Sequence, residues 1–245
     1  MLKVEDVSHW FGPKQVLDGV SFEVGAGEIL AVMGSSGGGK TTLLRCITGL
    51  IRPTQGTIEV DGVDVAQDPE KARESLGLVF QSAALFDYMN VADNIGFGLK
   101  RVRGMRSKEV AQKVEELLNL VGLSGSDKLM PSELSGGMKK RVGLARALAM
   151  EPKVVLYDEP TSGLDPITAY SIDQLIVEMR KKLGITSIVV SHDLSSIFRV
   201  SDRIAFLEKG KLAFLGTPQE FRVAQGDSIR ELVEKARSEQ LLKSD

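Results

Sequence analysis

The sequence has little of several residue types, and each scarcity excludes a class of protein. Its 245 residues include one cysteine, which rules out an intramolecular disulfide and fits a reducing, cytoplasmic setting. Its 31 basic and 33 acidic residues leave a net charge of only −2, without the basic excess of nucleic-acid binders or of proteins that bind anionic membranes. We therefore expect no nucleic-acid partner.

Long apolar runs are also missing. No stretch approaches the roughly 18 apolar residues that a membrane-spanning helix requires, and the first residues lack the basic-then-apolar order of a signal peptide. We expect a chain that is soluble by itself and reaches a membrane only through a partner.

The apolar patterns that are present predict an α/β fold with a helical insertion. Residues 2–8 and 16–24 alternate apolar and polar side chains as antiparallel strands do, whereas 28–34 form the short apolar run of a buried parallel strand. The pattern becomes helical between about residues 82 and 150, after which strand patterns return. We predict a single domain, 1–245, with an α/β core that includes an N-terminal antiparallel β subdomain (1–82 and 151–226), a helical subdomain (83–150), and a C-terminal helix and tail (227–245).

Three local expectations follow from helical spacing. Ser107 is a candidate N-cap for the helix that starts near it. Cys46 falls within an apolar helical pattern and is interpreted as a core residue. The terminal helix is expected to dock on its own domain, because its apolar residues share one face: Ile229, Leu232, Val233 and Ala236.

Residues 34–42, GSSGGGKTT, match a phosphate-binding loop. The pattern G-x-x-x-x-G-K-[ST] ends in Lys40 and Thr41 and lies between a predicted strand and a predicted helix. Glycines allow backbone N–H groups to turn toward phosphate oxygens, and a helix N-terminus favours negative charge. We predict that Lys40 meets the β- and γ-phosphates of a nucleotide and that Thr41 ligates Mg²⁺. The other candidate binding residues are Gly34, Ser35, Ser36, Gly37, Gly38, Gly39 and Thr42.

Polar residues end three further predicted strands. Asp158 and Glu159 follow an apolar run, at the edge of a parallel sheet where ligands bind. We predict Asp158 as a Mg²⁺ carboxylate and Glu159 as the base that polarises an attacking water. Gln81 is expected near the metal and the water, and His192 near the phosphate oxygens, although each alone is more often an ordinary surface residue.

A second glycine-rich helix start, LSGGM at 134–138, contains no lysine. Ser135, Gly136 and Gly137 offer a hydroxyl and backbone N–H groups to an anion. Considered alone, the tripeptide is a flexible N-cap.

Taken in order, these motifs resemble the ATP-binding cassette subunit of an ABC transporter over nearly the whole chain. The resemblance implies a Mg²⁺-dependent ATP hydrolase with a P-loop NTPase (RecA-like) core, in which Phe11 stacks on adenine; Trp10 is the alternative, and core packing is the ordinary role of either. The matching motifs are Walker A (Gly34 to Thr41), the Q-loop (Gln81), the signature (Leu134 to Met138), Walker B (Asp158, Glu159), the D-loop (Asp165) and the switch (His192). The resemblance implies that Gln81, Glu159 and His192 are catalytic, that Gln81 also ligates the metal, and that Asp165 contacts the nucleotide.

The resemblance also implies partners. Two cassettes pair head to tail, with ATP between the Walker A of one and the signature of the other, which accounts for a second anion site without lysine. An integral membrane permease would hold this homodimer at the cytoplasmic face of the inner membrane.

Three departures from the commonest cassette pattern resemble the ATPases of Mce-linked lipid transport systems, including the Mla phospholipid system. They are Met138 in place of the usual glutamine, the sequence QSAALFDYMNVADNIGF from Gln81, and GLDPITA at 163–169. They imply a lipid cargo and an Mce-domain substrate-binding protein. The alternatives are a cassette for another substrate, a non-transport cassette such as an iron–sulfur assembly factor, and another P-loop enzyme such as a small-molecule kinase.

Overall fold

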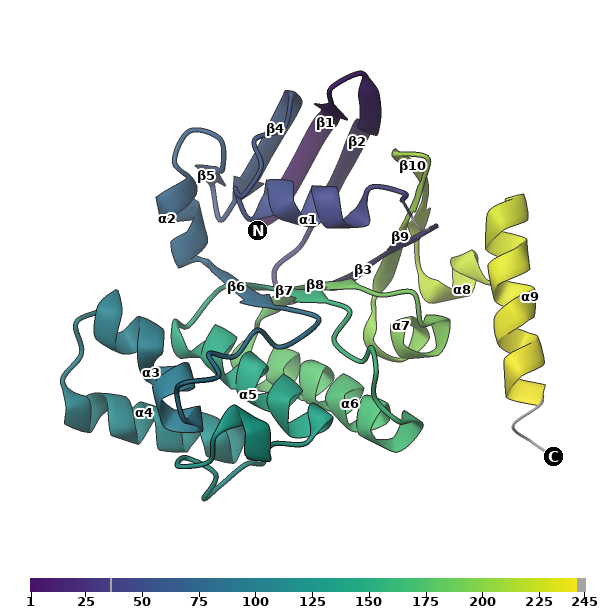
Figure 1. Cartoon of the computed structure of the whole chain (residues 1–245). Helices are drawn as coiled ribbons and strands as arrows, with labels where there is room; N and C mark the ends of the chain where they lie inside the picture. The colour runs from purple at the N-terminus through teal and green to yellow at the C-terminus, as the bar shows by residue number, and fades with distance from the viewer. Residues whose placement is uncertain (36, 242–245) are drawn as a thin grey trace.

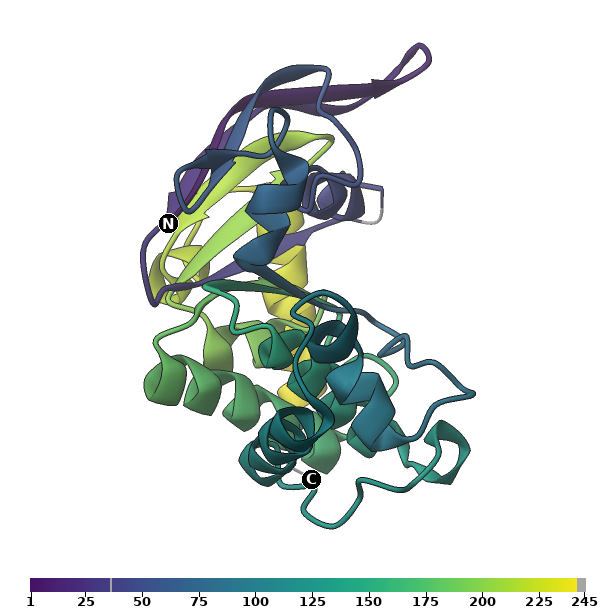
Figure 2. The same cartoon turned by 90° about the vertical axis from the view of Figure 1, so that its left-hand side faces the viewer.

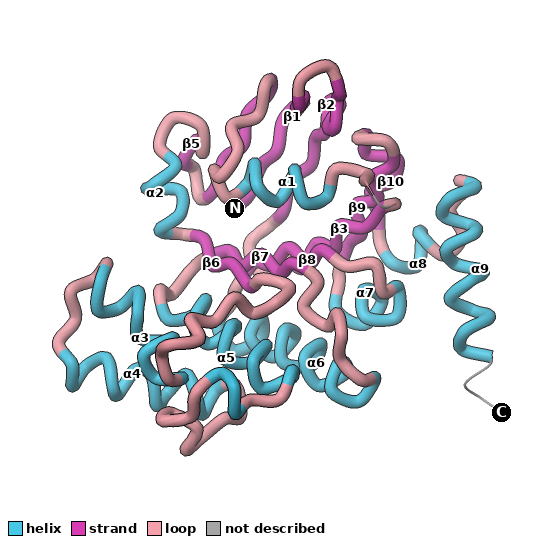
Figure 3. Tube along the Cα trace, in the orientation of Figure 1, coloured by secondary structure: helices cyan, strands magenta, loops and turns pink. Residues whose placement is uncertain are grey.

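Two β-sheets and a layer of helices form the molecule (Figure 1; Figure 3). The computed structural model describes residues 1–35 and 37–241, with side chains as far as 236. The strands are β1 (Leu2–Phe11), β2 (Lys14–Val24), β3 (Ile29–Gly34), β4 (Gln55–Val60), β5 (Val63–Asp64), β6 (Leu76–Val79), β7 (Val154–Asp158), β8 (Thr186–Val190), β9 (Arg203–Glu208) and β10 (Lys211–Gly216). The helices are α1 (Lys40–Ile47), α2 (Pro69–Glu74), α3 (Val91–Arg101), α4 (Ser107–Leu120), α5 (Gly136–Ala149), α6 (Pro166–Leu183), α7 (Leu194–Val200), α8 (Pro218–Phe221), α9 (Asp227–Leu241) and the 3₁₀ turn η1 (Pro131–Glu133).

The sheets confirm the predicted fold class. One has the order β2-β1-β4-β5 and is antiparallel, as the alternating pattern predicts. The other has the order β10-β9-β3-β8-β7-β6, in which β3 runs parallel to β8 and β9, and β7 runs parallel to β6 and β8. Parallel strands in one sheet bring their carboxyl ends to one edge.

The six-stranded sheet separates two hydrophobic cores. Successive residues of a strand point to opposite faces. Leu30 and Val32 of β3 therefore pack with α1 and the antiparallel sheet, whereas Ala31 and Met33 pack with the helical layer. Figure 1 accordingly shows α1 on one face of this sheet and α5, α6 and α7 on the other.

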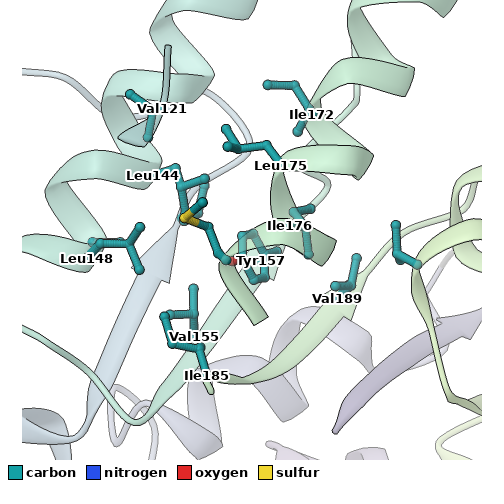
Figure 4. Packing of buried hydrophobic residues seen from close by; sticks show 14 of the residues in the cluster. Val121, Leu144, Leu148, Val155, Tyr157, Ile172, Leu175, Ile176, Ile185 and Val189 are labelled. Carbon is teal, nitrogen blue, oxygen red and sulfur yellow. The ribbon is translucent and has the colours of Figure 1, made fainter. Parts of the chain in front are cut away.

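Tyr157 lies at the centre of the larger core. This β7 residue is 1% exposed, and its ring packs among residues of α5 and α6 (Figure 4). Its neighbours include Leu144, Leu148 and Ile176. The strand that ends in Asp158 is thereby held rigidly against the helical layer.

Of the three local predictions from helical spacing, two are confirmed and one is wrong. Cys46 is a fully buried core residue, as predicted. The terminal-helix prediction is also confirmed, because Ile229 and Val233 are buried against the larger core. The N-cap prediction is wrong: Ser107 is the first residue of α4, and Arg106 is the N-cap. The Glu109 carboxylate accepts the Arg106 backbone N–H at 3.1 Å, which shifts the helix start by one residue.

No helix of the described residues is long and apolar enough to span a membrane. The boundaries drawn between the core, the helical subdomain and the C-terminal segment stay a prediction, and residues 242–245 of that segment lie outside the described part of the chain.

Candidate phosphate-binding and hydrolysis site

The loop between β3 and α1 adopts a conformation that requires glycine. Gly34, Gly37 and Gly39 have φ angles of 150°, 75° and 98°, a region that other residues rarely occupy. A Cβ on Gly34 would lie 2.1 Å from the Leu207 carbonyl oxygen, and one on Gly39 would lie 2.7 Å from the Val16 carbonyl oxygen. The loop is thus seated on β9 and β2 before it enters α1. Ser36, also predicted here, lies outside the described residues.

Lys40 places a half-buried positive charge at this loop. Its Nζ donates to the backbone carbonyls of Gly34, at 2.8 Å, and Ser35, at 3.0 Å. Burial lowers the pKa of Lys40, and the nearby carboxylates of Glu159 and Asp158 oppose that shift. The ammonium group and the N-terminus of α1 together favour an anion at this position.

Asp158 and Glu159 lie at the carboxyl end of β7, as predicted. Burial and the neighbouring Glu159 raise the pKa of Asp158, while Arg45, Lys140 and Lys40 act in the opposite direction. Glu159 has a φ of 48°, and its backbone N–H donates to the Val190 carbonyl of β8 at 2.9 Å. A non-glycine residue in this conformation is strained, which is a feature typical of functional sites.

The side chain of Glu159 is paired with His192. The Nδ1 atom of His192 lies 2.8 Å from Oε2 of Glu159. An ionised carboxylate only accepts hydrogen bonds, so this contact places the imidazole proton on Nδ1. Glu159 is only 15% exposed, whereas His192 is 71% exposed and faces outward. The structure therefore brings together two of the three predicted catalytic groups, and these two follow neighbouring strands.

Gln81 follows β6 at the same edge of the sheet. Its Nε2 donates to the Ser162 hydroxyl at 3.2 Å, which leaves the amide oxygen free of that contact. Its backbone carbonyl accepts a hydrogen bond from Lys140. The Lys140 ammonium also donates to the Glu159 carbonyl at 3.0 Å.

Lys140 is a site residue that the sequence did not identify. It lies in α5 among other basic residues, and it is only 6% exposed. One signal was available: position 140 lies on the same helical stripe as Gly137 and Leu144, which are both buried.

The signature residues form the N-terminus of α5. Ser135 is the N-cap, and its hydroxyl accepts the Met138 N–H at 3.3 Å. Gly137 is buried against α6, where a Cβ would lie 2.5 Å from Cγ2 of Thr168. Gly136 is exposed at the helix start. Because α5 and α1 lie on opposite faces of the six-stranded sheet, the two predicted anion sites of one chain are separate (Figure 1).

Asp165 caps the next helix. Its carboxylate accepts the N–H groups of Ile167 and Thr168, at 3.1 and 3.0 Å. A hydrogen bond with the Thr168 side chain, and then these backbone bonds, lower the pKa of Asp165. Its predicted contact with nucleotide stays a prediction.

Phe11 ends β1 on the hairpin that reaches away from the helices (Figure 2). Its ring is 49% exposed and meets the His9 ring edge-on at 4.7 Å and 79°. An exposed aromatic ring is free to stack on a base, so the adenine role stays a prediction.

The oxygen donors near the loop fit Mg²⁺. This ion takes one or two protein carboxylates and completes its shell with phosphate and water. Thr41 is exposed and Thr42 half-buried in the first turn of α1, and Asp158 and Gln81 supply a carboxylate and an amide oxygen. Among the described residues no cluster of three histidine, cysteine, aspartate or glutamate side chains is arranged to hold a metal.

Comparison with known proteins gives the family. The family model described as ABC transporter matches residues 17–162. The iron(III) import ATP-binding protein FbpC 1 of Pectobacterium atrosepticum is 42% identical over 89% of the chain, which spans 62% of that protein's length. The glutamine transport ATP-binding protein GlnQ of Escherichia coli is 40% identical, with 89% of this chain and 92% of GlnQ covered. The chloroplastic protein TRIGALACTOSYLDIACYLGLYCEROL 3 of Arabidopsis thaliana is 40% identical, with 94% of this chain and 72% of that protein covered.

Solved structures agree. A dimer of the ATP-binding cassette MJ0796, in a post-hydrolysis state with ADP and Pi, has a TM-score of 0.80 and 30% identity, and the match covers 89% of this chain and 99% of that one. CbiO1 of Clostridium perfringens, part of the ABC transporter complex cbiONQ, has a TM-score of 0.84 and 32% identity, with 100% and 98% covered.

Proposed function

This chain belongs to the ABC transporter family of ATPases, and we propose that it hydrolyses ATP between two copies of itself to drive a membrane permease that moves lipid. The contact between Glu159 and His192, at the edge of the sheet that carries the phosphate loop, supports the hydrolysis. The chain spans 62% and 58% of the first two curated relatives, FbpC 1 of Pectobacterium atrosepticum and MetN of Brucella abortus, so the activity of the whole assembly is part of this proposal.

The residues of the loop would hold the nucleotide. When bound, ATP supplies the terminal phosphoryl group that is transferred to water. The Lys40 ammonium now rests on the carbonyls of Gly34 and Ser35, and phosphate oxygens would replace those acceptors. Thr41, Asp158 and Gln81 are the oxygen donors for Mg²⁺.

Glu159 is placed to take the proton of the attacking water. Its carboxylate is mostly shielded, and the N–H of His192 fixes its orientation at 2.8 Å. A base with a fixed direction avoids the entropy loss of orienting it during the reaction. His192 remains largely exposed, so it can also approach a phosphate oxygen on its open side.

Head-to-tail pairing explains the second anion site. Ser135 caps α5, which lies on the opposite face of the six-stranded sheet from α1, the helix that begins at Lys40. In a dimer, Ser135 and the N–H groups at the start of α5 would close on the nucleotide that the other copy holds, and hydrolysis would remove the bridging phosphate. The MJ0796 cassette, which is 30% identical and dimeric with ADP and Pi bound, supports the pairing of two cassettes.

The substrate proposal depends on the sequence after Gln81, on Met138 and on the continuation of the D-loop. These segments resemble Mce-linked lipid ATPases, and a relative that is 40% identical carries the name of a galactolipid. The partners would be a permease and an Mce-domain protein. Iron and methionine import proteins and a glutamine transport protein, of 40–43% identity, favour a second candidate, a cassette for one of those solutes.

Affinity purification tests the substrate proposal directly. The tagged chain is isolated from detergent-solubilised membranes of its source, and co-purifying proteins and lipids are identified by mass spectrometry. A permease, an Mce-domain protein and enriched phospholipid are expected; a periplasmic-type solute-binding protein instead would favour the second candidate. Recovery of no membrane protein would contradict both transport proposals. Phosphate release without an acceptor substrate separates an ATPase from a kinase.

A further inference from the structure

Lys140 is a buried cation that joins two loops of the hydrolysis site. Its Nζ donates to the backbone carbonyl of Gln81 and to that of Glu159. Those carbonyls follow β6 and β7, whereas Lys140 lies in the second turn of α5. A single side chain of the signature helix therefore holds the backbone of both residues.

The bond to Glu159 constrains a strained residue. Glu159 has a left-handed φ of 48°, its N–H is bonded to Val190, and its carbonyl is bonded to Lys140. With both ends of the residue held, the direction of its side chain toward His192 is set by the backbone. Loss of either bond would allow the backbone to relax and the carboxylate to turn.

The same helix also holds the segment after Gln81. Arg146 donates to the carbonyls of Ala83 and Ala84, at 2.8 and 2.7 Å. Both alanines have positive φ angles, 60° and 45°. The loop is thus attached to α5 at two places, and of these two side chains Lys140 also bonds to Glu159, the residue after β7.

Fold stability alone is a weak reason for a lysine at this position. Lys140 is only 6% exposed, and burying an ammonium group costs free energy unless the group is paired. An apolar side chain of similar length would fill the volume without that penalty. The carbonyls that the ammonium satisfies belong to two residues with predicted roles in catalysis, which points to positioning.

We propose that Lys140 is a positioning residue for ATP hydrolysis, which fixes the backbones of Gln81 and Glu159 relative to each other and links both to the signature helix. The inference rests on the proposed function of Glu159. Because Ser135 caps the same helix, movement of the signature when it closes on a nucleotide would be passed to both loops through this ammonium.

The test separates turnover from nucleotide affinity. Phosphate release is measured against ATP concentration with Mg²⁺, and ATP affinity is measured with a fluorescent ATP analogue. Lys140→Met is expected to lower kcat at least tenfold and to change the Kd less than about threefold, since Lys40 and its loop are untouched. Lys140→Arg keeps the charge and the donors and should recover part of kcat. Lys182→Met, on the exposed surface of α6, is the control.

A double-mutant cycle that combines Lys140→Met with Gln81→Ala tests whether Lys140 acts through the loop of Gln81. If Lys140 acts through the loop of Gln81, the two losses in kcat combine to less than their product. A Lys140→Met enzyme within twofold of wild-type kcat, or one that loses affinity in proportion to kcat, would overturn the proposal. Losses in kcat that multiply fully in the double variant would also overturn the proposal.

Two further variants keep the outcome decisive. If Lys140→Met does not fold, Lys140→Gln, a neutral donor, takes its place under the same criteria. Wild type and Glu159→Gln are assayed alongside: equal rates for those two would refute the role of Glu159 in hydrolysis. A large difference between them with no effect at Lys140 would refute only the positioning role.

Discussion

His192 Nδ1 lies 2.8 Å from Glu159 Oε2, although 33 residues separate them in sequence. The contact exists because β7 and β8 are adjacent parallel strands, so that residues just beyond their carboxyl ends meet. It joins a shielded carboxylate to an exposed imidazole. The contact with His192 therefore helps to orient the Glu159 carboxylate.

Replacing the histidine tests that role. His192→Ala should lower kcat for ATP hydrolysis by roughly 100-fold, the usual scale for misplacing a general base, with little change in ATP affinity. Phosphate release and analogue binding measure the two quantities. His192→Gln, which keeps an N–H donor, should retain more activity than the alanine variant. Equal activity of all three proteins would show that the contact has no part in turnover.

Mixing two inactive variants tests the head-to-tail dimer. Lys40→Ala removes the phosphate cation, and Ser135→Arg obstructs the signature, so each homodimer should be inactive. In an equimolar mixture, half of the dimers pair unlike chains, and each of these holds one site with both residues intact. ATPase activity should therefore rise to as much as about a quarter of wild type. A mixture as inactive as its components would place both motifs at the same nucleotide within one chain.

We expect the Asp158 carboxylate to lower the stability of the protein when no ligand is bound. Burial and Glu159 raise the pKa of Asp158, which means that folding disfavours its ionised form. Asp158→Asn should therefore raise the Tm of the ligand-free protein while it abolishes Mg²⁺-dependent hydrolysis. The carboxylate is only half-buried, so solvent screens part of the penalty and a rise of about 2 °C is expected.

The pH dependence of that difference has a defined sign. The folded pKa of Asp158 lies above the unfolded value, so wild-type stability falls as pH rises from the unfolded value of 3.8 through the folded pKa. The asparagine variant lacks this fall. Its advantage in Tm should be absent at the acid end of this window and complete at neutral pH. An advantage that grows toward acid pH would contradict the assignment.

Met138→Gln should leave ATPase activity within about threefold of wild type. The side chain is partly buried against the larger core, where a flexible residue of similar length can replace it. The contact with Ser135 uses the backbone N–H of residue 138, which every substitution except proline retains. Steady-state phosphate release decides the matter; loss of all activity would show that the methionine itself is required.

Cys46 should be inert in the folded protein. It is fully buried, and burial raises its pKa to about 11, so the thiolate fraction at pH 8 is about 0.1%. Ellman's reagent should give almost no signal under native conditions and one thiol per chain in denaturant. Rapid reaction without denaturant would indicate that α1 opens locally.

Much of the site was readable from sequence because its chemistry lies in contiguous motifs. The glycines and Lys40 occur in one short loop, and the strand before them is a continuous apolar run. Strand ends likewise pointed to Asp158, Glu159 and His192, since the carboxyl ends of parallel strands share an edge. The prediction of Ser107 as N-cap is wrong because Glu109 bonds back to Arg106, a contact that competes with the usual N-cap preference.

What the sequence by itself determined is the family of motifs and the α/β fold, because local spacing and apolar periodicity encode both. What only the tertiary structure decided is which distant groups touch. The Glu159 and His192 pair, the bridge from Lys140 to Gln81, and the placement of α1 and α5 on opposite faces all depend on how strands pair and how helices pack. The sequence does not show whether a lysine in an amphipathic helix faces water or two carbonyl groups. Only the packing of the helix distinguishes these two environments.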